Sequence, residues 1–273
     1  MTTTHDANVK GFKIPLVGLG TWTLRGRECT RLVQEAIRLG YRHIDSAQMY
    51  DNEAEVGEGV RSSGLRAQVM VTTKIQPTLL SPRDVDRSVR ESLKKLKLDV
   101  IDLLLIHWPN PRVPLADTLG AMQRLKQQGV TRAIGVSNFT VALIEEACRI
   151  APDLVCNQVE CHPFLNQDKV FDACKRHGLA MVAYSPIARG SLSGDAVLER
   201  IGKAHGKSAA QVSLRYLTQQ GIVVIPRTSK AARLQENFEI FDFNLSDAEM
   251  REIHKLGSRD GRIVDWTWSP NWD

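Results

Sequence analysis

YRHIDSAQMY, residues 41–50, is the stretch that decides the fold of this chain. A short β-rich run ends there on the carboxylate of Asp45, and Tyr50 follows at the mouth of the next helix. Two later β-rich runs finish in the same way, on Lys74 and His107. Candidate strands that each end on a titratable residue predict a shared site at the carboxyl ends of parallel strands.

Short β-rich runs alternate with helical stretches along nearly the whole chain, giving eight β-then-α units. Parallel strands joined by helices either form an open sheet or close into a barrel, and eight is the number that closes. The runs are 16–22, the start of 41–50, 69–74, 100–107, 133–137, 155–160, 180–185 and 222–226.

The length of 273 residues is compatible with two average domains, but also with one barrel of about 250 residues. We therefore predict an α/β protein, a single-domain (β/α)8 TIM barrel over residues 1–273. An extra helix, opened by Ser246 and Glu249, and an aromatic C-terminal tail lie outside the repeat.

Several helix ends carry recognisable signals. Gly40 stops the first helix, and Ser81-Pro82 opens the third with an N-cap followed by proline. Capping boxes are predicted where Ser208 precedes Gln211 and, near Asn52, where Glu55 has the required spacing.

The composition is that of an ordinary globular protein, with 42% hydrophobic and 25% charged residues. Residues 1–6 lack a basic segment followed by an apolar run, and no later stretch approaches the roughly 18 apolar residues of a membrane span. Five cysteines without a CxxC pair favour reduced thiols over a disulfide framework or a metal site. We therefore expect a cytoplasmic protein with no metal and no membrane partner.

The net charge of +5 and the pI near 9.0 raise the question of nucleic acid binding. The basic residues are, however, interleaved with acidic ones along amphipathic helices, as in the segment 83–97. That pattern is typical of a solvated helix face, so no nucleic acid partner is expected.

The three strand-end residues and Tyr50 fit one reaction. A tyrosine hydroxyl, with an ordinary pKa of ~10, is a poor acid at neutral pH unless its phenolate is stabilised. Lys74 is expected to lower the pKa of Tyr50, Asp45 to hold Lys74 charged, and His107 to donate to a substrate carbonyl. This arrangement favours carbonyl reduction, with Tyr50 as the general acid.

Such a reaction needs a hydride, which no side chain supplies, so a nicotinamide or a flavin is required. The chain has no GxGxxG motif, because Thr23 stands where the third glycine belongs. It has no P-loop either, because Ile201 occupies the place of the leading glycine. A dinucleotide must therefore bind in another way.

Six segments together resemble the signature of the aldo-keto reductases, in the family's order and over nearly the whole chain. They are 43–50, 73–74, 105–109, 135–139, 157–160 and 225–228, the last accompanied by Arg233, Glu236 and Asn237. Within that family the chain is most similar to the prokaryotic 2,5-diketo-D-gluconate reductases of the B type, in its short connection after His107 and its compact ending.

The resemblance implies NADPH lying extended across the barrel rim. Ser137, Asn138 and Gln158 match positions that hold the carboxamide, and Tyr184 matches the ring that stacks on the nicotinamide. The remaining matched positions are Thr21, the pyrophosphate stretch with Ser185, Ile187 and Ser191, the 2′-phosphate clamp of Arg227, Thr228, Ser229 and Arg233, and the adenine contacts Glu236 and Asn237.

Paired guanidinium groups with hydroxyls suit a phosphate dianion better than a ribose diol, which favours NADPH over NADH. Arg227 replaces the lysine that many family members have, so the charge is kept while its geometry changes.

The substrate is expected to be a small aldehyde or ketone held against apolar walls formed by Trp22, Met49, Ile75 and Trp108. The resemblance implies 2,5-diketo-D-gluconate as substrate and a monomeric enzyme, and methylglyoxal and β-keto esters are equal candidates. Two alternatives stay open: a Schiff-base aldolase that uses Lys74 as nucleophile, and a nucleotide-sensing regulatory subunit.

Overall fold

The computed structural model describes residues 5–273. The expectation that residues 1–6 form no targeting segment therefore falls mostly outside the described residues. Eight parallel strands form one sheet in the order β10-β9-β8-β7-β6-β5-β4-β3. They are β3 (Leu19–Gly20), β4 (His43–Asp45), β5 (Met70–Ile75), β6 (Ile101–Ile106), β7 (Thr131–Ser137), β8 (Cys156–Glu160), β9 (Ala180–Tyr184) and β10 (Val223–Val224).

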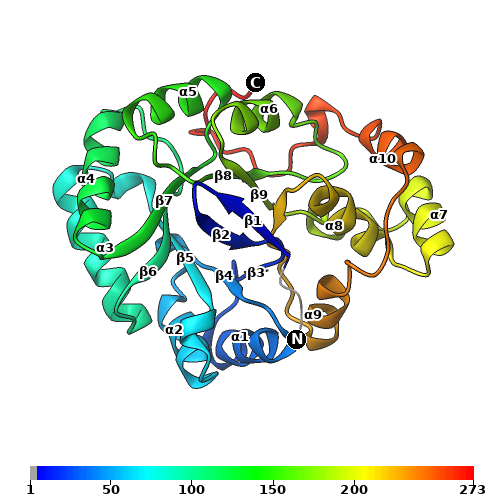
Figure 1. Cartoon of the computed structure of the whole chain (residues 1–273), viewed down its shortest axis with the longest axis horizontal. Helices are drawn as coiled ribbons and strands as arrows, with labels where there is room; N and C mark the ends of the chain where they lie inside the picture. The colour runs from blue at the N-terminus through cyan, green and yellow to red at the C-terminus, as the bar shows by residue number, and fades with distance from the viewer. Residues whose placement is uncertain (1–4) are drawn as a thin grey trace.

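Parallel bridges between Val17 and Val224 and between Gly20 and Arg227 join the two outer strands. The sheet therefore closes on itself, and the predicted (β/α)8 barrel is confirmed. Figure 1 shows the helices arranged as a ring around it. They are α1 (Gly26–Leu39), α2 (Glu53–Ser62), α3 (Pro82–Leu96), α4 (Leu115–Gln127), α5 (Val141–Ile150), α6 (Asp168–Arg176), α7 (Ala196–His205), α8 (Ala209–Gln219), α9 (Ala231–Phe238) and α10 (Asp247–His254).

Alternation along the strands decides what each side chain faces. In β5, Met70 belongs to the apolar cluster inside the barrel, whereas Val71 and Ile75 belong to the cluster between strands and helices. Lys74 lies an even number of positions after Met70, so its side chain also points into the barrel. By the same alternation, inward side chains at the carboxyl ends of the other strands are those of Asp45, His107, Ser137, Gln158 and Tyr184.

A hairpin of β1 (Asp6–Val9) and β2 (Phe12–Pro15), which the sequence analysis did not predict, covers the amino-terminal end of the barrel. Val9 and Ile14 pack into the interior cluster beside residues such as Met70 and Ala180, which begin their strands. In Figure 1 the hairpin lies over the centre of the ring. The interior therefore opens at the carboxyl end of the strands.

Most predicted helix ends are confirmed. Gly40 ends α1 with a left-handed φ of 115°, and the Ser81 side chain accepts from the backbone N–H of Asp84. Capping boxes open α8 at Ser208 and α10 at Ser246.

The capping box predicted at Asn52 is wrong, because the buried Asn52 side chain makes no cap. It donates to the carbonyl oxygens of Thr21 and Leu24, at 2.8 and 3.1 Å, and accepts from the Ser46 hydroxyl at 2.8 Å. Asn52 thus ties the loop after β3 to the loop after β4, both of which border the site.

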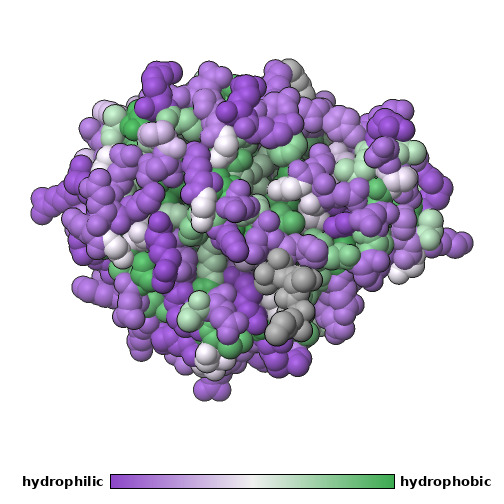
Figure 2. All heavy atoms as spheres, in the orientation of Figure 1, coloured by the Kyte–Doolittle hydropathy of each residue, from purple (hydrophilic) through white to green (hydrophobic). Residues whose placement is uncertain are grey.

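Hydrophilic side chains cover most of the face seen in Figure 2, and apolar ones gather only in small groups. Within residues 5–273, no helix has the length and apolar character needed to cross a bilayer.

Candidate active site

Lys74 stands at the centre of a buried group of polar side chains on β4 and β5. Its Nζ donates to Asp45 Oδ1 at 2.5 Å, to the Ser46 carbonyl at 2.8 Å and toward the Tyr50 hydroxyl at 3.3 Å. Gln158 donates to the second Asp45 oxygen at 2.7 Å. The carboxylate is therefore paired on both oxygens, and the ammonium is fixed beneath the tyrosine.

Tyr50 comes from the 3₁₀ turn η1 (Gln48–Tyr50) and its ring lies over the Lys74 ammonium, 4.8 Å from the centroid. Burial, and then the Asp45 carboxylate, raise the pKa of Tyr50 well above its usual value of 10.0. The expected net lowering of this pKa is not found, because burial and the Asp45 carboxylate dominate it. Tyr50 consequently keeps its proton at neutral pH.

His107 completes the set from the end of β6. Its ring meets that of Tyr50 edge to face at 5.5 Å between centroids. Burial, followed by the charge of Lys74, holds the pKa of His107 well below 6.5. The imidazole is thus neutral at physiological pH and carries a single N–H. The structure brings together all four predicted catalytic residues.

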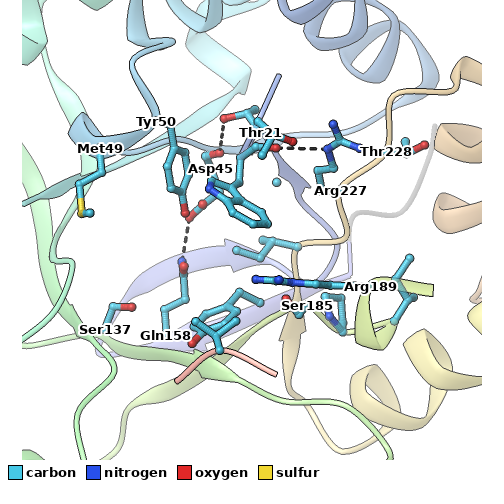
Figure 3. Close-up of a pocket in the computed structure, with 18 of the residues that line it drawn as sticks. Thr21, Asp45, Met49, Tyr50, Ser137, Gln158, Ser185, Arg189, Arg227 and Thr228 are labelled. Carbon is cyan, nitrogen blue, oxygen red and sulfur yellow. Dashed lines mark hydrogen bonds between the residues drawn. The ribbon is translucent and has the colours of Figure 1, made fainter. Parts of the chain in front are cut away.

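These four side chains lie at the floor of a cavity of about 420 Å³ at the carboxyl end of the barrel. In Figure 3 Met49 and Tyr50 lie at one end of the cavity, and Arg227 and Thr228 lie at the other. Of the predicted cofactor and substrate residues, those lining it are Thr21, Trp22, Met49, Trp108, Ser137, Asn138, Gln158, Tyr184, Ser185, Ile187, Arg227, Thr228, Ser229 and Arg233.

One wall of the cavity carries amide and hydroxyl groups that are themselves held in place. Asn138 has a left-handed φ of 62° and donates to the His107 carbonyl at 2.9 Å. The Tyr184 hydroxyl donates to Asn138 Oδ1 at 2.9 Å. Together with Ser137 and Gln158, this wall offers fixed donors and acceptors to a ligand amide.

The far end of the cavity is basic. Arg227 and Arg233 are exposed, while Thr228 is buried between them at 4% exposure. Arg227 donates through Nε to the Trp22 carbonyl at 3.2 Å. Two free guanidinium faces beside two hydroxyls suit the charge and geometry of a phosphate.

Four predicted site residues do not line the cavity. Ile75 is wrong as a substrate wall, because its outward parity buries it completely against the helices. Ser191 is exposed and donates to the Ala188 carbonyl at 2.8 Å. Glu236 accepts from the Ser208 hydroxyl at 2.6 Å, and Asn237 is buried on α9. These three residues are not among those that line the cavity.

Arg189 is a cavity residue that the sequence analysis missed. Its guanidinium lies over the Trp22 ring, 4.7 Å from the centroid, so it bridges the loop after β9 and the loop after β3. Ser185, Ala188 and Arg189 all have left-handed φ values, between 44° and 53°. In the sequence, Arg189 could have been found only as a basic residue within the predicted pyrophosphate stretch.

The C-terminal tail, residues 262–273, supplies another missed part of the wall. Val264 and Trp266 line the cavity. Trp268 and Trp272 meet Trp108 edge to face, at 5.1 and 6.0 Å between centroids. The three tryptophans of this tail therefore pack at the mouth of the site.

The geometry argues against a Schiff-base role for Lys74. Its side chain has no exposed surface, and its three donors already point at Asp45, Ser46 and Tyr50.

Within residues 5–273, no cluster of three His, Cys, Asp or Glu side chains is placed to hold a metal ion.

Comparisons with known proteins identify the relatives of this chain. A sequence profile of the Aldo/keto reductase family matches residues 16–258. The chain is 38% identical to the methylglyoxal reductase DkgB of Yersinia pestis, over 95% of this chain and 99% of the relative. It is 41% identical to the glyoxal reductase of Bacillus subtilis, with 93% and 92% of the two chains covered.

A solved structure of a candidate 2,5-diketo-D-gluconic acid reductase B superimposes with a TM-score of 0.97. It is 43% identical, and the match covers 99% of this chain and 98% of that one. The similarity therefore extends over the barrel, the site and the tail together.

Proposed function

Because the chain belongs to the Aldo/keto reductase family, whose members are oxidoreductases acting on carbonyl groups, we propose that it reduces small aldehydes and ketones with NADPH. The observation that carries the proposal is the stack of Asp45, Lys74 and Tyr50 at the floor of the cavity, with His107 against the tyrosine ring.

These side chains suit a carbonyl that becomes an alcohol. The neutral imidazole of His107 has one N–H with which to orient the substrate oxygen. Tyr50 transfers its hydroxyl proton to that oxygen as negative charge develops there, and Lys74 stabilises the phenolate that remains. Asp45 keeps the lysine charged, and the phenolate then recovers a proton from water.

The residues around the cavity fit a nicotinamide dinucleotide. The amide-rich wall of Ser137, Asn138 and Gln158 would hold the carboxamide, with the Tyr184 ring beside it. The basic end would hold the 2′-phosphate through Arg227 and Arg233, which is the argument for NADPH over NADH. When bound, the nicotinamide supplies the hydride that no side chain can provide.

The proposed substrates are small dicarbonyls, with methylglyoxal, 2,5-diketo-D-gluconate and β-keto esters as the first candidates. Their support is the similarity to proteins named for methylglyoxal, glyoxal and diketogluconate reduction. The setting we propose is the cytoplasm, which agrees with five free cysteines. A monomer in size-exclusion chromatography is the expected oligomeric state.

The test is the oxidation of NADPH by the purified protein with these three carbonyls and nitrobenzaldehyde, repeated with NADH. Turnover with NADPH, and weaker turnover with NADH, is the expected result. Tight NADPH binding without turnover of any carbonyl would contradict the proposal and favour a nucleotide-sensing subunit.

A further inference from the structure

The carboxylate of Glu160 is a buried charge that the chemistry above does not use. It ends β8, two residues after Gln158, and its side chain has no exposed surface. One oxygen accepts from the Ile263 backbone N–H at 2.7 Å and lies 2.9 Å from His162 Nε2. The other accepts from the Val264 backbone N–H at 2.8 Å.

These contacts hold the C-terminal tail where it enters the wall of the cavity. Burial alone would raise the pKa of Glu160, but the hydrogen bonds from His162, Ile263 and Val264 outweigh it and lower that pKa. The carboxylate is therefore ionised at neutral pH. Charge-assisted bonds to two consecutive backbone N–H groups fix both the position and the direction of the tail.

The segment just before the tail is held in register against the loop after β8. Leu165 and Ser258 form a parallel bridge, and the backbone N–H of Ser258 donates to the Phe164 carbonyl at 3.1 Å. A Cβ on Gly261 would stand 1.8 Å from the Phe164 carbonyl oxygen, so the backbones meet closely here. The chain is thus fixed at Gly261, and the tail that follows bonds Glu160 within three residues.

Beyond Glu160 the tail becomes part of the site. Val264 and Trp266 line the cavity, and Trp266 remains 51% exposed at its mouth, stacked on Trp268. Trp22 and Met49, both also about half exposed, belong to the same rim. An apolar surface that continues outward from the cavity is suited to the part of a substrate remote from its carbonyl.

We infer that Glu160 is a positioning residue: it seats the tail so that Trp266 forms a binding surface for the large apolar groups of bulky carbonyl substrates. Small dicarbonyls do not reach this surface and are indifferent to it. The kinetic part of the inference rests on the proposed carbonyl reductase function, whereas the seating of the tail does not.

The first test compares KM for naphthaldehyde and for methylglyoxal. In Glu160→Gln an amide N–H faces a backbone N–H, and KM for naphthaldehyde is expected to rise about tenfold. Its kcat, and both constants for methylglyoxal, should stay within about twofold. Trp266→Ala, at an exposed position, should likewise raise KM for naphthaldehyde about tenfold, without a risk to folding.

The double variant Glu160→Gln/Trp266→Ala decides whether Glu160 acts through the tail. If it does, KM for naphthaldehyde equals that of Trp266→Ala alone. Effects that multiply, or equal losses with both carbonyls, would overturn the inference. Glu53→Gln is the matched control, because Glu53 is also buried but bonds Thr73 at 2.6 Å, away from the tail.

A second test needs no activity. Trypsin cleavage after Arg262, followed by mass spectrometry of the 263–273 fragment, reports release of the tail. Glu160→Gln should be cleaved about tenfold faster than the wild type, and Glu53→Gln should not. Equal cleavage of all three proteins would refute the seating role, even if no carbonyl were turned over by the wild type.

Discussion

The Lys74 ammonium nitrogen and the Tyr50 hydroxyl oxygen lie 3.3 Å apart, although helix α2 separates the turn that carries Tyr50 from the strand that carries Lys74. The tyrosine is thereby aimed from the barrel floor into the cavity. Burial keeps the proton on Tyr50, and the lysine beneath it stabilises the phenolate that remains once the proton is transferred.

Replacement of Tyr50 by phenylalanine removes the proton donor and leaves the shape of the site. We expect kcat for carbonyl reduction to fall by about 10²- to 10⁴-fold. NADPH affinity, measured by fluorescence titration, should change by less than about twofold. Reduction at the wild-type rate would show that the acid is another group.

The Asp45–Lys74 pair should show strong coupling in unfolding. Asp45→Asn or Lys74→Met leaves a buried partner uncompensated, and each is expected to lower the free energy of unfolding by about 3–5 kcal/mol. The double variant should lose clearly less than the sum. Urea denaturation of the four proteins gives the cycle, and additive losses would argue against a direct pair.

His43 makes stability sensitive to acid. Burial, only partly offset by Asp45, lowers the pKa of His43 to about 4. Above pH 6.5 the folded and unfolded chains are both neutral at this residue. Below it only the unfolded chain gains the proton, so the free energy of unfolding should fall by about 3 kcal/mol between pH 6.5 and 4.

The variant His43→Asn isolates this effect. It replaces a ring whose Nε2 lies 3.0 Å from Thr72 Oγ1. Urea midpoints at pH 7 and pH 4.5 should differ less in the variant than in the wild type. An unchanged difference would mean that other groups cause the acid sensitivity.

The basic end of the cavity should distinguish the two nucleotides. Arg227→Met and Arg233→Met are each expected to raise KM for NADPH about tenfold and to leave KM for NADH nearly unchanged. Lys230→Met is the matched control, because Lys230 is exposed on the same segment but does not line the cavity. Parallel losses with both nucleotides would contradict a 2′-phosphate site.

Arg189 should contribute to nucleotide affinity. Its contact with Trp22 ties two loops together across the cavity, and such exposed contacts are worth about 0.5–1 kcal/mol. Arg189→Met should raise the dissociation constant of NADPH about fivefold, because it also removes a positive charge that faces the cavity. Arg200→Met, on the outer surface of α7, controls for net charge. Equal affinities of the two variants would rule out this role.

The sequence predicted the strands and the catalytic set because both follow from local pattern. Inward parity at a strand end places Asp45, Lys74 and His107 at the same rim without knowledge of any distant contact. By the same alternation Ile75, one position after the inward-pointing lysine, points outward, which is why its prediction as a substrate wall was wrong.

Other features depend on partners far along the chain. The hairpin turn at Lys10-Gly11 has φ values of 52° and 82°, as a type I′ turn requires, but Lys-Gly is a weak turn signal. The pKa of Tyr50 depends on burial, which no spacing reveals. The tail is bonded at the site by Glu160, about a hundred positions earlier.

Closure of the barrel has a consequence for how the protein is made. The bridges from Val17 to Val224 and from Gly20 to Arg227 join the beginning of the chain to its last quarter. During synthesis the early strands therefore keep an open edge until the eighth has left the ribosome, roughly 10–40 seconds later at about 5–20 residues per second. Truncated chains that lack β10 should expose that edge and aggregate, and chaperones are expected to bind the nascent protein in this interval.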